Sequence, residues 1–309
     1  MCLIAPVSTC RNIFLITYWR ELVMHSGLLI YGREDYKKNQ WFADQFVARA
    51  QEQGLTIDLV LTDELFLGID EQFYAAARRK RLATPDFVIN RSRNSIIATH
   101  FEKMGCRVFN SAFITEICNH KGKTHQFINS HGIKSVKTWI GNRHDFCVEQ
   151  FDGDFPLILK SVAGHGGREV FLIANEKELT EKLAAFSGDE FILQEVCTNP
   201  GVDIRVFVMG NEILAAVKRY SEKSFKANFS LGGKVEPYSL SDDEKRLVKK
   251  ITQLAQFDFV GIDFILDEEG RFLFNEIEDV VGSRVLYKCY DMDVVGKYLA
   301  YIEKSQKGK

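Results

Sequence analysis

The sequence predicts an α/β fold, in which a small open parallel sheet precedes a longer α+β region. From residue 24 onward, short apolar runs typical of buried strands alternate with segments of helical periodicity, as in βαβ units. Past Trp139 the apolar runs lie closer together and are joined by glycine-containing turns. The first pattern favours a parallel sheet covered by helices, and the second favours a strand-rich second half.

Length and composition are those of a globular protein with a substantial core. The chain has 309 residues, enough for two or three compact units, and 46% of them are hydrophobic. A formal net charge of −2 gives no basic field for nucleic acid. Its 7 cysteines form no CxxC pair, so we expect a cytoplasmic protein without a disulfide framework or a zinc site.

The first 23 residues are unusual. Their apolar runs are interrupted by Arg11, they lack the basic start and clean cleavage site of a signal peptide, and they are too short to cross a bilayer. Met24 directly precedes the first expected strand. We therefore expect residues 1–23 to be an upstream extension, with the functional chain beginning near Met24 and no membrane partner.

The first half of the chain contains the expected βαβ elements. Apolar runs predict strands at 28–31, 57–61, 86–90 and 107–109, and helical spacing predicts helices at 39–53 and 96–104. The apolar residues of the first helix are Trp41, Phe42, Phe46, Val47 and Ala50. No GxGxxG follows the first strand, so no dinucleotide site is indicated.

Arg91 and Arg93 follow a predicted strand end. They are the best candidates in this half for binding an anionic substrate. An ordinary helix entry explains them equally well.

The second half is predicted to begin with two helices and then to become strand-rich. Gly210 and Asn211 mark a hairpin turn between two of its strands. The predicted helices are 112–118, 121–130, 176–186 and 242–255, and the predicted strands are 156–160, 169–173, 191–194, 203–209, 213–219, 260–264 and 271–274.

Acidic residues gather where the last two strands end. Glu276 and Glu278 follow one apolar strand, and Asp263 lies in the strand before it. Clustered carboxylates repel one another unless a cation lies between them, and carboxylate oxygens are the ligands that Mg²⁺ prefers. The three residues are therefore candidate magnesium ligands. An acidic turn after an edge strand is the alternative.

A glycine loop at residues 163–168 joins two predicted strands. Glycines let backbone amides approach phosphate oxygens closely, and Lys160 at the preceding strand end can reach the same space. A plain hairpin turn is the alternative, and the pattern is not that of a P-loop, which needs GKS or GKT.

Two further segments carry polar groups beside predicted strands. Residues 194–197 leave a strand as a hinge whose backbone groups can meet an adenine edge, although an ordinary strand end explains this segment better when it is taken alone. Asp203 and Arg205 share one face of a strand, and a cross-strand ion pair of Asp203 with Arg205 or Lys218 is the simplest structural explanation. That explanation does not extend to Arg219 and Asn228, which suit a site that holds phosphate, metal and a carboxylate.

Taken in order, these motifs resemble the ATP-grasp ligases, and among them the RimK-like glutamate ligases. The resemblance covers roughly residues 110 to 290, and the ordered spacing is much more specific than any single motif. It implies an ATP-grasp domain at 111–309, with a lid subdomain at about 120–190 and a catalytic subdomain at about 191–309. Residues 24–110 would be the α/β domain that precedes it.

The resemblance also implies roles for the site residues. Arg219, Asn228 and Lys160 would be catalytic, and Asp263, Glu276 and Glu278 would bind two magnesium ions, for which manganese can substitute. The residues assigned to ATP are Lys121, Lys160, Gly164, His165, Gly166, Gly167, Gln194, Glu195, Val196, Cys197, Asp203 and Arg205.

The chemistry of this family is amide formation through an acyl phosphate, with release of ADP and phosphate. It needs no protein nucleophile, because cations neutralise the transferring phosphoryl group. The partners would be a small-molecule or peptide carboxylate and an amine or amino acid, and an oligomer remains open.

The chain departs from the family pattern at one of its central motifs. Where glutamate ligases read Glu-x-Asn-x-x-Pro-Gly, this chain has Glu278 for the asparagine and Val281 for the proline. The acid often used for the ribose has no clear counterpart, and Thr198 or Asn199 would take its place. The departures bear on the substrate rather than on ATP.

Two other functions fit the same motifs. One is a phosphotransferase on this fold that joins no amine. The other is a nucleotide-binding regulatory protein without ligase activity, and the complete set of acids argues against it.

Overall fold

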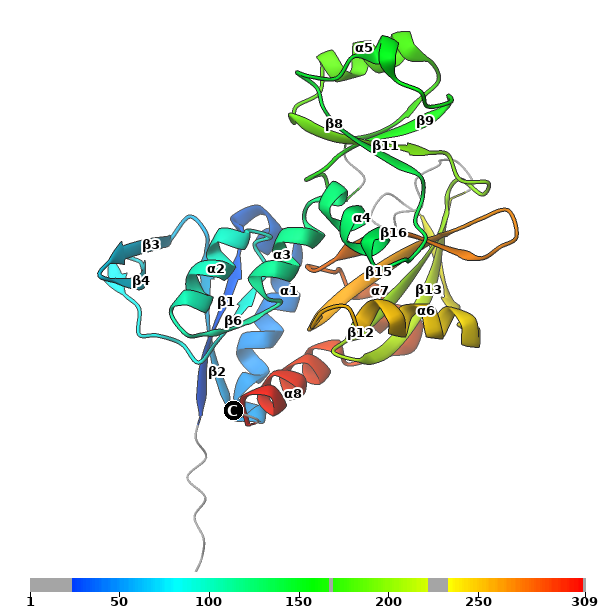
Figure 1. The fold of residues 1–309 in the computed structure, drawn as a ribbon. Coiled ribbons are helices and arrows are strands. Elements are labelled where there is room, and N and C mark those ends of the chain that lie inside the picture. Colours follow the sequence, from blue (N-terminus) through cyan, green and yellow to red (C-terminus); the bar gives the residue numbers. More distant parts are fainter. Residues whose placement is uncertain (1–23, 167–168, 222–232, 308–309) are drawn as a thin grey trace, which may run out of the picture.

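The computed structural model describes residues 24–166, 169–221 and 233–307 and has an α/β fold with three large sheets (Figure 1). The N-terminal sheet is parallel, with strand order β2-β1-β6-β7. Its elements are β1 (His25–Tyr31), α1 (Arg33–Arg49), η1 (Ala50–Gln53), β2 (Leu55–Leu61), β6 (Phe87–Asn90), α2 (Ser95–Lys103) and β7 (Arg107–Phe109). This confirms the predicted parallel α/β unit.

A small three-stranded antiparallel sheet projects from this unit and was not predicted. It consists of β3 (Leu65–Asp70), β4 (Gln72–Ala77) and β5 (Lys80–Arg81). Only alternate positions of β3 and β4 pack against the core, through Leu65, Leu67, Ala75 and Ala77. Their exposed positions include the apolar residues Phe66, Ile69 and Phe73, so the polar–apolar alternation of a half-buried strand is missing from the sequence.

The predicted surface of the first helix was partly wrong. Phe42, Phe46 and Ala50 are buried as expected, but Trp41 is 57% exposed and Val47 is 39% exposed. The apolar face is therefore narrower than the spacing suggested, since Ala43 is buried with these three residues while Trp41 and Val47 lie beyond the buried strip. Trp41 instead makes an edge contact with Tyr287.

The second large sheet, which we call the upper sheet, is antiparallel and has the strand order β10-β9-β11-β8. Two helices lead into it, and α5 covers one of its faces. The elements are α3 (Ala112–Cys118), α4 (Lys121–Ser130), β8 (Thr138–Asn142), η2 (Val148–Gln150), β9 (Leu157–Ser161), β10 (Val170–Ile173), α5 (Glu176–Ala184) and β11 (Glu190–Glu195).

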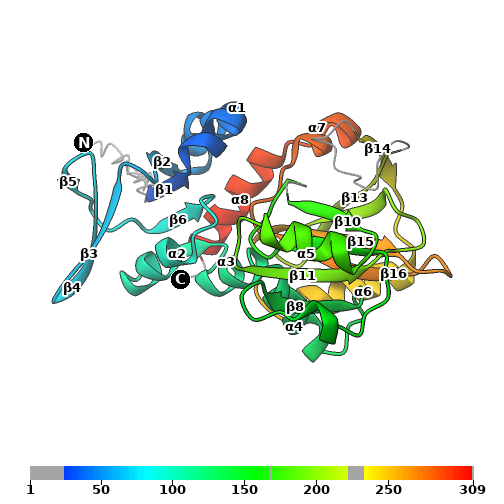
Figure 2. The same ribbon diagram turned by 90° about the horizontal axis from the view of Figure 1, so that it is seen from above.

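The third sheet, which we call the large sheet, is antiparallel and has the strand order β14-β13-β12-β15-β16. Seen from above, the upper sheet overlies it (Figure 2). The elements are β12 (Val202–Met209), β13 (Glu212–Tyr220), β14 (Lys234–Tyr238), α6 (Asp242–Thr252), β15 (Phe259–Leu266), β16 (Phe272–Glu278), α7 (Arg284–Tyr290) and α8 (Val294–Lys307). Gly210 has a positive φ of 58° in the β12–β13 turn, as a tight hairpin requires.

One hydrophobic core extends through the N-terminal sheet and the large sheet. It includes Phe46 of α1, Phe109 of β7, Phe207 of β12 and Tyr298 of α8. Helix α8 returns to pack on α1. Among the described residues, the helices are too short or too polar to cross a bilayer.

Polar contacts tie the same two layers together. The side-chain nitrogen of Asn110 donates to the carbonyls of Phe259 and Asp279, both at 3.1 Å, and its oxygen accepts from the backbone N–H of Asp258. The Asp258 carboxylate in turn pairs with Arg107 and accepts from the Tyr301 hydroxyl at 2.8 Å. These contacts join β7 to the start of β15.

The buried Asp258 makes stability depend on pH. Burial raises the pKa of its carboxyl group to about 6, against the lowering effect of Arg107. The folded protein therefore binds this proton more tightly than the unfolded chain, and the stability it contributes below pH 4 is lost as pH rises through 6. Relative to Asp258→Asn, the wild type should lose up to about 3 kcal/mol of unfolding free energy between pH 4 and pH 7.

Urea unfolding at several pH values measures this difference. Asp152→Asn is the matched control, because Asp152 is exposed. A difference between wild type and Asp258→Asn that stays constant over this range would contradict the prediction.

Candidate functional site

Strand pairing brings three acids together on one face of the large sheet. Asp263 of β15 lies opposite Glu276 of β16, and Glu278, two residues further on, points to the same side. Oxygens of the three carboxylates lie within 4.8 Å of one another. Three hard oxygen donors at this spacing suit a magnesium ion, so the residues fit the metal that the family resemblance implies.

Two buried arginines hold these acids. Arg205 donates from Nε and Nη2 to the two oxygens of Asp263, at 2.7 and 2.6 Å, and its Nη1 lies 2.7 Å from Glu278. Arg219 donates to Asp263 at 2.7 Å. Burial acts to raise the pKa of Asp263, but the two guanidinium groups outweigh it and hold the pKa below its usual range. Asp263 is therefore ionised in the folded protein.

The expected partner of Asp203 was wrong. Its carboxylate pairs with Arg219 at 2.5 Å, not with Arg205 or Lys218. The register of β12 and β13 puts Asp203 opposite Arg219, whereas Lys218 points to the other face and pairs with Glu236. Arg219 thus has a structural partner as well as a place beside the acids.

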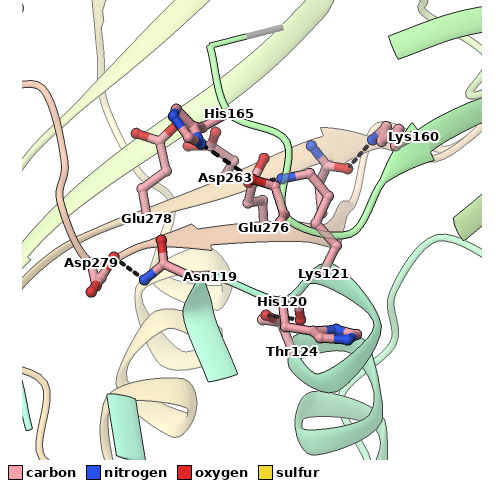
Figure 3. Close-up of polar contacts among 12 residues, drawn as sticks. Asn119, His120, Lys121, Thr124, Lys160, His165, Asp263, Glu276, Glu278 and Asp279 are labelled. Atoms are coloured by element: carbon pink, nitrogen blue, oxygen red, sulfur yellow. Dashed lines mark hydrogen bonds and ion pairs between the residues drawn. The ribbon is translucent and has the colours of Figure 1, made fainter. Parts of the chain in front are cut away.

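Two lysines approach the acids from the upper sheet and from α4. Figure 3 shows Lys121 extending from α4 to Glu276, with which it forms an ion pair, and Lys160 beside the neighbouring strand. The ammonium group of Lys160 donates to Asn275 Oδ1 at 3.3 Å. Burial lowers the pKa of Lys160 to about 8, and Lys121 adds to this, while Glu276 opposes it.

A first cavity of about 130 Å³ lies between the upper sheet and the large sheet. The hinge residues 194–197, Lys160 and Asp203 line it, as do all three acids. Gly164, His165 and Gly166 of the glycine loop lie at the same cavity. Gly167 and Asn228 lie outside the described residues.

A second cavity of about 470 Å³ opens on the other side of the acids, between the N-terminal sheet and the large sheet. Glu276 and Glu278 line both cavities, as do Lys121 and Arg219. Arg91 and Arg93, which follow a strand of the N-terminal sheet, also line the second cavity. The further lining residues from this half are Asp35, Lys38 and Asn39 of α1.

Cations without an acidic partner face the second cavity. Within the described residues, no carboxylate lies at ion-pair distance from Lys38, Arg91 or Arg284, whereas Arg93 pairs with Asp35. Arg91 is 6% exposed and donates to the carbonyl of Val281 at 3.1 Å. Sequence reasoning missed Lys38 and Arg284, because only the packing of α1 and α7 around one cavity distinguishes them from surface cations.

The amino-acid sequence matches a known protein family. Residues 118–302 match the RimK-like ATP-grasp domain. The chain belongs to this family. It is therefore an ATP-binding enzyme of the ATP-grasp ligase type, as the order of the sequence motifs predicted.

Curated relatives cover most of the chain. Human beta-citrylglutamate synthase B is 27% identical over 281 residues, covering 85% of this chain and 72% of the relative. The alpha-aminoadipate–LysW ligase LysX of Sulfurisphaera tokodaii is 26% identical, covering 87% of this chain and 96% of the relative.

A solved structure shows the same fold. D-alanyl-alanine synthetase A from Vibrio cholerae superposes with a TM-score of 0.70 at 12% identity, covering 93% of this chain and 99% of that one.

The arginine pairs predict a large loss of stability when one is removed. Arg205→Met removes one of the two guanidinium groups that hold the buried Asp263 and the partner of the half-buried Glu278, which should cost about 3 kcal/mol. Arg271→Met is the matched control, since Arg271 pairs with Asp267 and Glu269 at the surface and its loss should cost at most about 1 kcal/mol. Urea unfolding of both variants measures the contrast, and equal losses would contradict it.

Proposed function

We propose that the protein is an ATP- and magnesium-dependent ligase that joins a carboxylate to an amine. The observation that carries this proposal is the position of the acids between two cavities. A nucleotide in the first cavity and an acid in the second would meet at Glu276 and Glu278. A regulatory nucleotide site would have no need of the second cavity.

The first cavity suits ATP. Lys160 and Lys121 line it as cations for the phosphates, and the glycine loop from Gly164 can direct backbone amides at phosphate oxygens. The hinge at 194–197 would receive the adenine. Gly167 would belong to the phosphate loop. Asp203 would support the nucleotide site through its ion pair with Arg219, and Arg205 through its ion pair with Asp263.

Asp263, Glu276 and Glu278 would hold two magnesium ions, for which manganese can substitute. When bound, magnesium would neutralise charge on the phosphoryl group that is transferred. Lys121 forms an ion pair with Glu276, and Arg205 forms one with Glu278. With magnesium bound, these two carboxylates would contact both the metal and their basic partners. Arg219 would add positive charge beside the γ-phosphate, and Asn228 would add an amide donor.

The second cavity suits the acid and the amine. Lys38, Arg91 and Arg284 are cations available to an anionic substrate. The substrate carboxylate would attack the γ-phosphorus and release ADP. The amine would then attack the carbonyl carbon of the acyl phosphate, release phosphate and lose a proton. Relatives named as a citrylglutamate synthase and an aminoadipate ligase support an amino acid as one partner.

The products test the proposal. Given ATP, magnesium, a suitable acid and an amine, the protein should form ADP, and Glu276→Gln should lower the rate at least about 100-fold. Glu236→Gln, at an acid on β14 that pairs with Lys218, is the control and should retain activity. AMP as product would refute the acyl-phosphate mechanism, and a stable phosphorylated acid formed equally fast without amine would favour a phosphotransferase.

The lysine pKa predicts how ATP binding changes with pH. Lys160 carries a proton below its pKa of about 8 and loses it above, so its attraction for phosphate weakens as pH rises. The dissociation constant for ATP with magnesium should rise roughly fivefold from pH 8 to pH 9. Calorimetric titration measures it. Lys160→Arg, which stays charged, should remove this pH dependence, and an unchanged slope in that variant would contradict the assignment.

A further inference from the structure

Strand β3 is the free edge of the small sheet β3-β4-β5. Figures 1 and 2 both show this sheet at the outer end of the N-terminal unit, away from the upper sheet and the large sheet. Alternate residues of an edge strand direct their N–H and C=O groups outward, where another strand can pair with them. Within the described ranges, no backbone bond joins residues 66–70 to a segment other than β4.

This edge lacks the features that usually prevent strand pairing. Edge strands are commonly shielded by charged residues, proline or a bulge, and here β14 contains Lys, Glu and Pro while β5 consists of Lys and Arg. From Leu65 to Ile69, β3 has only apolar residues and a glycine, and its register with β4 is unbroken. Strands β8 and β10 of the upper sheet are also uncharged, but they have 5 and 4 residues against the 6 of β3.

Large apolar side chains are exposed on both faces of β3. Phe66 is 65% exposed on one face, and Ile69 is 71% exposed on the other, beyond the core contacts of Leu65 and Leu67. Removing such groups from water is favourable by about 25 cal/mol per Å² of apolar surface. The strand therefore offers a partner both backbone groups and apolar side chains.

One face of β3 is complementary to the same strand in a second copy of the chain. Two copies related by a two-fold axis perpendicular to the sheet pair antiparallel, and their matching faces stay on the same side. With Leu67 on the axis, Leu65 lies opposite Ile69 of the second copy. The exposed Ile69 then continues the apolar face that Leu65 and Leu67 begin.

The other face matches in size. In the same register, Phe66 lies opposite Gly68 of the second copy, so a large side chain meets a position without one. The ring of Tyr74 covers that glycine, and the guanidinium group of Arg81 lies 4.3 Å from the centre of this ring. Phe66 of one copy would therefore pack against an aromatic ring of the other, a contact that is favourable between cross-strand neighbours.

The charges at the strand ends also fit. Antiparallel pairing brings Asp70 of one copy beside Glu64 of the other, and Asp70 has no ion pair within the described part of the chain. Arg78 stands at this position, because its Nε lies 3.0 Å from Glu64 and its Nη2 donates to the carbonyl of Leu59. A guanidinium group has five N–H donors, so the Nη1 of Arg78 can donate to Asp70 of the second copy.

We propose that two copies of this chain associate by antiparallel pairing of β3 about a two-fold axis at Leu67, which joins their small sheets into one. No residue of β3, β4 or β5 lines either cavity, so the dimer is independent of the proposed ligase function. A single strand pair with a few apolar side chains lies at the small end of stable interfaces, about 1,200 Å². We therefore expect a dissociation constant in the micromolar range.

Sedimentation velocity of the intact protein over the micromolar range tests the association. The wild type should pass from monomer to dimer as its concentration rises. Ile69→Lys sets a charge against Leu65 of the second copy twice in each dimer, and it should raise the dissociation constant at least about 30-fold. Ile140→Lys is the matched control, because Ile140 is a 43% exposed isoleucine on another edge strand, β8, and should leave the constant unchanged.

Disulfide trapping tests the register. Leu67→Cys places two thiols opposite each other on the axis, with Cα atoms about 4.5 to 5.5 Å apart, a separation that a disulfide can span. Oxidation should link residue 67 to itself, and peptide mapping by mass spectrometry distinguishes this link from links through native cysteines. Ile69→Cys is the control, since its two copies lie about 13 Å apart along the strands and should not link to each other.

Each outcome supports or overturns the inference. A wild type that stays monomeric over the whole range overturns it, as does a dimer that survives Ile69→Lys or that dissociates equally with Ile140→Lys. Loss of the dimer in Ile69→Lys without the link at residue 67 overturns the register. Formation of ADP by the ligase reaction is measured separately, so failure of this inference leaves the proposed function intact.

Discussion

The pairing of Arg205 and Arg219 with Asp263 is the interaction on which the centre of the molecule depends. Buried charges cost several kcal/mol each unless they are matched with good geometry, so β12, β13 and β15 must keep their register for the pairs to form. The same register places Asp263 beside Glu276. A slip by one residue would turn every second side chain to the other face. The same strand register is therefore needed both for the stability of the large sheet and for the assembly of the acidic site.

The junction between the N-terminal sheet and the large sheet is the second condition for function. Asn110 ties β7 to β15 and to the backbone just past β16, and Asp258 adds contacts with Arg107 and Tyr301. Since Arg91 comes from the N-terminal sheet and the acids from the large sheet, this junction sets the width of the second cavity. Contacts far from the acids thus shape the space beside them.

Much of this could be predicted from local pattern. Apolar periodicity located the parallel unit, and the ordered motifs from Lys121 to Glu278 indicated the family before any geometry was known. Other features left no local signal. Asp203 pairs with Arg219 because of strand register, and Trp41 is exposed because the core covers a narrow strip of α1. The strands β3 and β4 carry apolar residues on their exposed positions as well, so they lack the polar–apolar alternation that marks a half-buried strand.

The sequence by itself determined the fold class, the family and the residue types available for phosphate, metal and adenine, because strand and helix periods and motif order are written along the chain. The tertiary structure alone decided which charges are matched and which remain available to a substrate. Lys38 and Arg284 become cavity residues only when distant elements pack together. His125 and Gln194, 69 residues apart in sequence, become hydrogen-bonded neighbours only in the fold. Ion pairing and hydrogen-bond direction depend on distances in space, and a linear pattern does not contain them.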